Sequence, residues 1–145
     1  MRTLTPEDLA AFLELPLVAV LGTHWRDGSV LLSPVWHEWQ GGGFTVATTA
    51  SDVKVRHLTR DPRASLLVAE SEPPYRGIEV RCRATLTPDP GGATAVRLAI
   101  RYLGETRGRD YAATLEDDTL IRLEPDGPGQ IRVWDFADDF PPDRG

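Results

Sequence analysis

The chain has 145 residues, with 16 Lys and Arg against 22 Asp and Glu, and a formal net charge of −6 at pH 7. This length fits one domain with a real core, but it is small for an enzyme that encloses a large cofactor alone, which a pocket shared by two subunits would solve. The acidic balance argues against a nucleic-acid or anionic-membrane binder. A single cysteine excludes an internal disulfide framework. No N-terminal apolar segment resembles a signal peptide or a membrane span, so we expect a cytoplasmic protein.

The N-terminal part predicts a short helix followed by two paired strands. Thr5-Pro6-Glu7-Asp8 supplies an N-cap, a proline at the first helical position and acids in the first turn, and Pro16 ends this helix. Residues 17–21 are almost continuously apolar, as in a strand buried on both faces. Asp27-Gly28 then indicates a hairpin turn, after which a strand over residues 30–39 should pair with the first.

The segment from Val46 to Leu67 carries the strongest functional signal. It reads as the end of a strand, a polar turn, a short basic helix, a stop at Pro62 and a new strand. The side chains of this segment that could meet a phosphate are Thr48, Thr49, Ser51, Lys54 and Arg56.

Two interpretations of this segment stay open on chemistry alone. Ser51 is an N-cap candidate, and the free N–H groups of the first helical turn favour an anion, to which Lys54 and Arg56 would add charge and directed donors. However, any surface helix can begin with Ser-Asp and carry a solvated basic face, and Asp52 in the first turn would repel an anion.

The rest of the chain predicts more short strands and two helices. Further strands are expected at residues 44–49, 64–69, 77–86, 119–123 and 131–136, with helices at 95–103, stopped by Gly104, and 107–114. Regular strands joined by turns indicate a closed or partly closed antiparallel barrel. We expect a single domain over residues 1–137 and a mobile acidic tail over 138–145.

The order and spacing of several loose motifs resemble the pyridoxamine 5′-phosphate oxidase-like split-barrel superfamily, most closely its flavin/deazaflavin oxidoreductases that use coenzyme F420. The similarity runs from about Leu17 to Phe136. Its motifs are Gly28, Leu32-Ser33-Pro34-Val35-Trp36 and the run Thr48-Thr49-x-Ser51-x-x-Lys54-x-Arg56-x-Leu58-x-x-Asp61-Pro62-Arg63-x-Ser65-Leu66.

This resemblance implies a mainly β fold, a Greek-key split β-barrel of about six strands with a few short peripheral helices. It also implies a homodimer that binds F420, or alternatively FMN, at the subunit interface and transfers hydride to or from a small organic substrate. The residues expected along the cofactor ring are Ser33, Pro34, Val35 and Trp36, with Thr48, Thr49, Ser51, Lys54 and Arg56 at the phosphate and Trp134 as a wall of the site. Packing or a dimer contact is an equally good interpretation of Trp36, and simple packing is an open alternative for Trp134.

Two departures from the oxidases argue against vitamin B6 oxidation. Arg132 matches their substrate-binding arginine, but Trp134 stands where they have a histidine, and Ser33 occupies the position of an FMN-binding arginine. An FMN-dependent oxidase of B6-like amines therefore stays as an alternative. A carrier of flavin or tetrapyrrole without a catalytic cycle is a second one.

Other chemistries lack their residues. The histidines at 24, 37 and 57 have no zinc-site spacing, and we predict no metal. We place His57 on the basic helix surface or against nearby carbonyls. Cys82 alternates with strand residues and reads as a small core side chain rather than a nucleophile. No catalytic side chain is identified, which fits an enzyme whose bound cofactor performs the chemistry.

Overall fold

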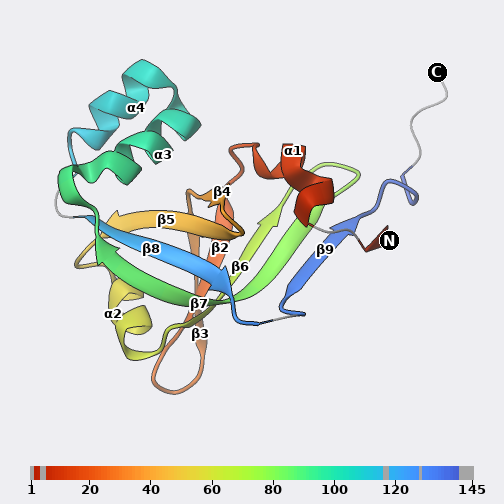
Figure 1. Ribbon diagram of the computed structural model, residues 1–145, viewed down its shortest axis with the longest axis horizontal. Helices are drawn as coiled ribbons and strands as arrows, with labels where there is room; N and C mark the ends of the chain where they lie inside the picture. The colour runs from red at the N-terminus through yellow and green to blue at the C-terminus, as the bar shows by residue number, and fades with distance from the viewer. Residues whose placement is uncertain (1, 4–5, 116–117, 128, 141–145) are drawn as a thin grey trace.

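The computed structural model describes residues 2–3, 6–115, 118–127 and 129–140 (Figure 1). Within these described residues, nine strands form one antiparallel sheet, and seven of them follow the order β3-β2-β6-β7-β8-β5-β4, while β9 pairs with β7 and β1 with β9. The strands are β1 Arg2–Thr3, β2 Ala19–His24, β3 Val30–Val35, β4 Glu38–Gln40, β5 Gly43–Thr49, β6 Arg63–Ala69, β7 Gly77–Pro88, β8 Asp118–Pro125 and β9 Ile131–Asp135. This architecture confirms the predicted mainly β split barrel.

The long strand β7 forms the centre of the sheet. Its residues 77–83 pair with β6 on one side, while β9 and then β8 pair along the other. Ile78, Val80 and Cys82 face the core, whereas Arg81 and Arg83 face solvent, as the alternation of apolar and charged residues predicts. Burial raises the pKa of the Cys82 thiol to about 12, so it is a neutral core group.

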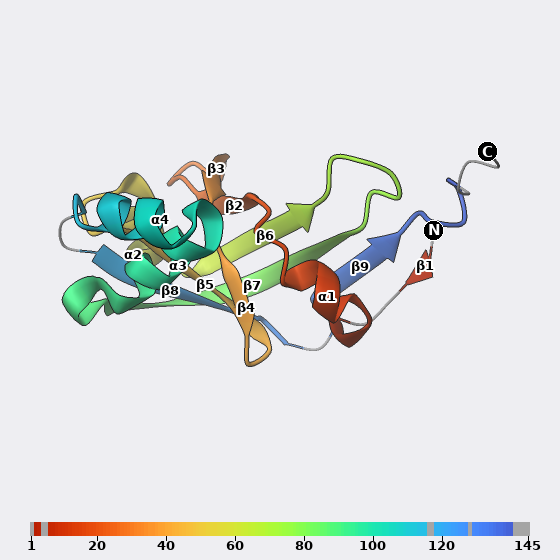
Figure 2. The same cartoon turned by 90° about the horizontal axis from the view of Figure 1, so that it is seen from above.

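The helices cover separate parts of the sheet (Figures 1 and 2). They are the 3₁₀ turn η1 Pro6–Leu9, α1 Ala10–Leu13, α2 Val53–Arg60, the 3₁₀ turn η2 Pro90–Gly92, α3 Ala93–Leu103 and α4 Glu105–Ala112. The α3–α4 hairpin stands at one end of the molecule, and β9 with β1 at the other. Gly104, with φ of 87°, makes the turn between α3 and α4, where the sequence predicts a helix stop.

The predicted strand over residues 30–39 is wrong in one respect: it breaks at Trp36-His37. Up to Val35 the chain pairs with β2, but from Glu38 it pairs with β5, so β3 and β4 lie at opposite edges of the sheet. Val35 and Glu38 are three Cα-to-Cα steps apart, and three steps span at most about 11 Å. The two sheet edges formed by β3 and β4 must therefore come together here. Residues 36–37 are therefore the seam at which the sheet curls into a half-barrel, and we call them the seam below.

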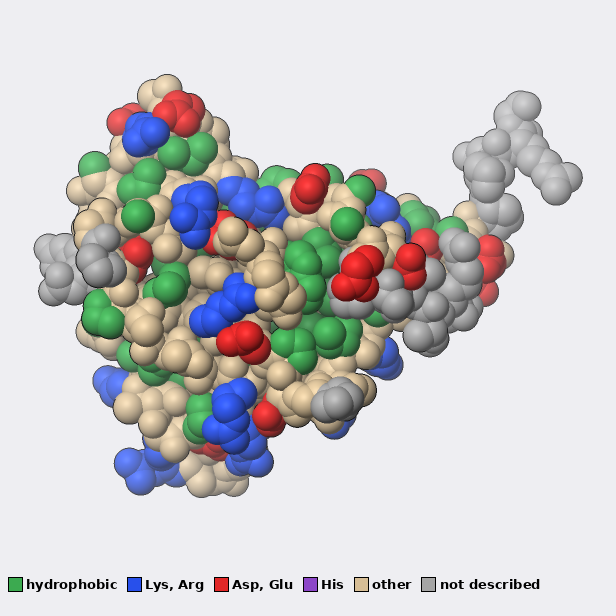
Figure 3. Space-filling model, in the orientation of Figure 1, with side chains coloured by type: hydrophobic (Ala, Val, Ile, Leu, Met, Phe, Trp, Pro, Cys, Tyr) green, Lys and Arg blue, Asp and Glu red, His purple; other side chains and the backbone are tan. Residues whose placement is uncertain are grey.

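Charged side chains of both signs share the surface. On the face in Figure 3, Lys and Arg lie in separate groups with Asp and Glu near them, rather than in one basic band. The longest helix, α3, has 11 residues, and in the described part of the chain no helix is long and apolar enough to cross a membrane.

Candidate cofactor groove

Side chains of α3 hold the seam in place. Because the seam leaves the ladder, its backbone groups need other partners. The His37 N–H donates to the Tyr102 hydroxyl over 3.0 Å, and Arg101 Nε donates to the His37 carbonyl over 3.0 Å. The Tyr102 ring also stacks on Trp36, with ring centroids 5.1 Å apart and planes 10° apart. Trp36 is thereby fixed by packing.

A groove of about 380 Å³ runs beside the seam. It lies between β3, the end of β5 and the start of α2, and Tyr111 of α4 forms one side. Its lining residues are Val18, Pro34, Val35, Trp36, Ala47, Thr48, Lys54 and Tyr111. The groove brings together five of the predicted cofactor residues, from two segments of the sequence that the fold joins. We call it the seam groove.

Asp52, and not Ser51, is the N-cap of α2. Asp52 has the extended backbone of a cap residue, and its Oδ1 accepts from the Lys54 N–H over 2.9 Å. Its Oδ2 lies 3.0 Å from Lys54 Nζ and accepts from Thr48 Oγ1 over 3.3 Å. Partial burial opposes ionisation, but these hydrogen bonds and the Lys54 charge hold the pKa of Asp52 below its ordinary value. The prediction for Ser51 is wrong because the helix begins one residue later than expected.

Lys54 is the only lysine in the sequence, and its side chain is only 12% exposed. Lys54 lines the seam groove, and its ammonium group is paired with Asp52. An anion in the groove would therefore share Lys54 with the Asp52 carboxylate, or replace it. This competition is the repulsion between Asp52 and a bound anion that the sequence predicts.

The other predicted phosphate residues lie outside the seam groove. Thr49 lines a smaller pocket beside it, and Ser51 is exposed in the turn before α2. Arg56 is exposed and lines a different groove, together with Trp25 and Arg60. Ser33 faces Leu21 in the β2–β3 register and is partly buried.

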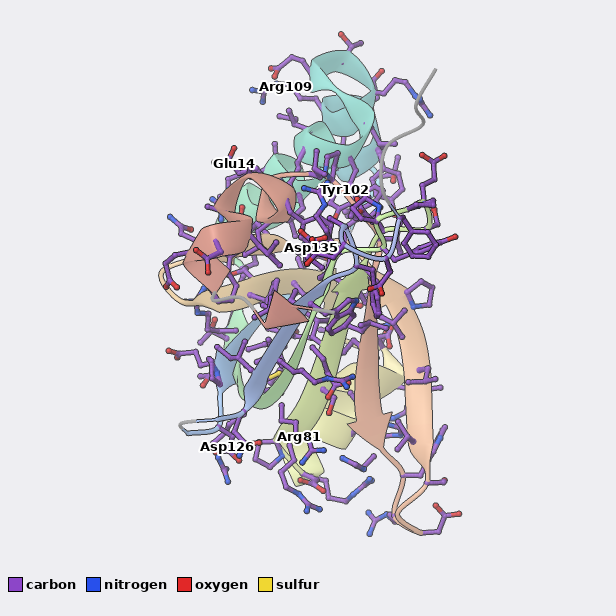
Figure 4. All side chains as sticks on the ribbon, turned by 90° about the vertical axis from the view of Figure 1, so that its right-hand side faces the viewer. Glu14, Arg81, Tyr102, Arg109, Asp126 and Asp135 are labelled. Carbon is purple, nitrogen blue, oxygen red and sulfur yellow. The ribbon has the colours of Figure 1, made fainter. Side chains whose placement is uncertain are left out.

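Arg132 and Trp134 lie on β9, away from the seam groove of their own chain. Arg132 pairs with Glu79 at 3.3 Å, and its guanidinium lies 5.2 Å from the centre of the Trp134 ring. That ring covers Gly77 of β7 so closely that a Cβ there would overlap it. Arg132 shares a groove with Arg81, which Figure 4 shows at the opposite end of the sheet from Tyr102.

His57 is buried, so its predicted surface position is wrong. The face of α2 that carries His57 packs on β2, where His57 Nδ1 lies 2.9 Å from Thr23 Oγ1. The Trp25 and His57 rings pack edge to face, with their centroids 4.2 Å apart. Burial, with the charges of Arg60 and Arg56, lowers the pKa of His57. The short helix pattern has too few apolar residues to show which side faces the sheet.

The sequence reasoning also missed the supporting cluster around His37, Tyr102 and Tyr111. His37 is fully buried, and desolvation with the nearby Arg101 charge lowers its pKa to about 4. Tyr102 lies in the helix predicted over residues 95–103, but residue spacing carries no signal for the hydrogen bonds of its hydroxyl. Among the residues that the structure describes, no group of three or more His, Cys, Asp or Glu is placed to hold a metal ion.

Comparisons with known proteins identify the family. A solved structure described as an F420 reductase is 30% identical, covers 85% of this chain and 97% of its own, and has a TM-score of 0.71. A conserved hypothetical protein, Rv2991, from Mycobacterium tuberculosis is 21% identical with a TM-score of 0.77, covering 98% and 91%. HutZ, described as the heme storage protein from Vibrio cholerae, is 19% identical with a TM-score of 0.65, covering 93% and 95%.

The curated protein sequences gave no match. The family model for pyridoxamine 5′-phosphate oxidase matches residues 5–131, which is most of the chain. Together with the half-barrel and the F420 reductase at 30% identity, this match leads to one conclusion: the chain belongs to the pyridoxamine 5′-phosphate oxidase-like split-barrel family.

Proposed function

We propose that this protein is an oxidoreductase that binds F420 in the seam groove and transfers hydride to or from a small organic substrate. One observation carries the proposal: Pro34 and Trp36 at the sheet edge line the same groove as Lys54. A ligand with a flat ring at one end and a phosphate at the other suits such a groove. The 30% identity to an F420 reductase favours F420 over FMN.

Lys54 and Thr48 form the anionic end of the proposed site. The Lys54 ammonium supplies a full charge and the Thr48 hydroxyl a hydrogen-bond donor, at the N-terminal end of α2, where the helix dipole favours an anion. Both side chains contact Asp52. Binding of a phosphate thus requires Asp52 to give up part of these contacts.

Pro34, Val35 and Trp36 form the ring end. β3 is an edge strand, so its outer side has no neighbouring strand among the described residues, and Pro34, which has no N–H, is tolerated there. Trp36, held by Tyr102, supplies a fixed apolar wall that excludes water. F420 would supply the hydride chemistry, and the protein would hold and shield it.

We propose that a second copy of the chain completes the site. The groove of about 380 Å³ is near the lower end of the 300–1,000 Å³ range for pockets of drug-sized ligands. Its flank is apolar and open: Val18 is 53% exposed and Leu32, on the outer face of β3, is 67% exposed. A partner chain on this face would bury both side chains and deepen the groove.

The test is a parallel titration of the purified protein with F420 and FMN, followed by fluorescence quenching and anisotropy. We expect F420 to bind more tightly than FMN, and Lys54→Ala to weaken F420 binding about tenfold or more. Arg107→Ala, which removes one positive charge from an exposed position on α4, is the matched control. A Lys54→Ala variant that binds F420 normally would refute the assignment of Lys54.

A second readout uses the single lysine. Acetylation of Lys54, followed by mass spectrometry, should slow in the presence of F420 if the phosphate covers the ammonium group. Tighter binding of FMN would instead support a flavin enzyme. Binding of neither cofactor would overturn the proposal, and haem would be titrated next.

A further inference from the structure

A second, smaller pocket adjoins the seam groove beneath the α3–α4 hairpin. Its volume is about 140 Å³, and it shares Trp36, Ala47, Thr48 and Tyr111 with the groove. Its other walls include Leu98 of α3 and Leu115 after α4. Among the described residues that line the pocket, Asp118, the first residue of β8, supplies the one charged side chain. We call this space the hairpin pocket.

The size of the hairpin pocket suits a single ring. An apolar cavity of about 150 Å³ is large enough to bind benzene in an engineered protein. Trp36, Leu98 and Leu115 provide the apolar surface against which such a ring can pack. A tricyclic ring would not fit, so the hairpin pocket does not compete with the seam groove for a flavin-like cofactor.

Asp118 determines the chemistry that the pocket prefers. Among the residues that the structure describes, none donates a hydrogen bond to its carboxylate, although the side chain is partly buried. Desolvation, with the nearby Asp89 charge, raises the pKa of Asp118. Asp89 itself accepts hydrogen bonds from Thr94 and Ala95 at the start of α3, so it is already satisfied. A carboxylate without a donor beside an apolar cavity favours a ligand that brings a cationic or N–H donor.

Tyr111 connects the two spaces. Its ring packs edge-on against the Trp36 ring, with the ring centroids 5.4 Å apart and the ring planes at 63°. Tyr111 lines both the groove and the pocket. Within the described part of the chain its hydroxyl has no hydrogen-bond partner, so it offers a second polar contact at the passage between them. A ligand seated in the pocket therefore extends past Tyr111 towards the proposed position of the cofactor.

We propose that the hairpin pocket is a substrate subsite for an organic amine: a group of about one ring that carries an ammonium or amine N–H, held by Asp118. The subsite's role in catalysis rests on the proposed function, whereas its binding of amines does not. The acidic net charge of the chain also favours cationic over anionic ligands.

The test is binding of benzylamine to the full chain without cofactor, measured by calorimetry and by ligand-observed NMR. Benzylamine should bind, and benzoate, which has the same ring and the opposite charge, should bind at least tenfold more weakly. Asp118→Asn, close to isosteric, should weaken benzylamine binding about tenfold. Asp110→Asn removes the same charge from an exposed site on α4 that lines neither space, and should leave binding unchanged.

Equal binding of benzylamine to the two Asn variants, or equal binding of benzoate and benzylamine, would overturn the proposal. Leu115→Trp, which fills only the hairpin pocket, should abolish benzylamine binding and leave F420 affinity unchanged. Titration of F420 into the same variants separates the two proposals. If the wild type does not bind F420, the proposed function is refuted. If Asp118→Asn binds benzylamine as tightly as the wild type does, the subsite alone is refuted.

Discussion

Replacing Tyr102 by Phe tests whether α3 holds the seam. The hydroxyl donates to the Leu17 carbonyl over 2.7 Å, accepts from the His37 N–H over 3.0 Å, and lies 3.0 Å from His37 Nδ1. Phe would keep the ring stacked on Trp36 but remove all three contacts. Because His37 is fully buried, its N–H would be left without a partner. A buried donor without a partner costs about 1–3 kcal/mol, and we expect a loss of about 2 kcal/mol in the free energy of unfolding.

The measurement is urea unfolding monitored by tryptophan fluorescence, with thermal unfolding beside it. A loss of about 2 kcal/mol corresponds to a fall of about 6 °C in Tm for a chain of this size. Tyr111→Phe is the matched control, since that hydroxyl has no bond within the described residues, and it should change the unfolding free energy by less than about 0.5 kcal/mol. If the two variants are equally stable, α3 does not hold the seam through Tyr102.

Three further predictions concern pH, charge and packing. Folding lowers the pKa of His37 from the ordinary value of about 6.5 to about 4, so the unfolded state binds the proton first. When the pH falls from 7 to 5, the unfolding free energy of the wild type should therefore drop by about 2 kcal/mol more than that of His37→Gln. Parallel pH profiles of the two proteins would exclude this role of His37. Asp52→Asn keeps a good N-cap but frees Lys54, so F420 should bind about fivefold more tightly by fluorescence titration, and weaker binding would contradict the competition described above. Gly108→Ala places a Cβ 2.6 Å from the backbone of Ile100, and we expect a net loss of about 1–2 kcal/mol by urea unfolding despite better helix propensity; a stabilised variant would be inconsistent with close helix contact.

Where residue type constrains the backbone directly, the sequence predicts the fold well. Gly104 stops α3 because its positive φ suits the turn, and Gly41 and Gly42 close the β4–β5 hairpin with positive φ. The alternation in β7 indicates its core face because a strand has a period of two residues. Such features depend only on neighbours in the chain.

The errors come from choices that depend on distant partners. Residues 30–39 are predicted as one continuous strand, yet the pairing partner changes from β2 to β5 at the seam, and a side-chain pattern carries no label for its partner. Ser51 and Asp52 are both acceptable caps by residue type. Asp52 is the cap because only its carboxylate reaches Lys54 and Thr48 together. His57 is drawn inward by Thr23 of a strand that lies 34 residues earlier.

The seam explains why a ligand site should arise at this place in the half-barrel. A sheet satisfies its backbone groups through neighbouring strands, but where β3 gives way to β4 the chain crosses from one sheet edge to the other and the ladder stops. The protein supplies substitutes from α3 on one side, through Arg101 and Tyr102. On the other side, the outer edge of β3 has no strand beside it in the part of the chain that the structure describes, and Lys54 lies close by. Edge polarity, a fixed aromatic wall and one positive charge thus meet because of how the sheet closes. A ligand or a second chain that covers this edge therefore adds partners where the fold provides none.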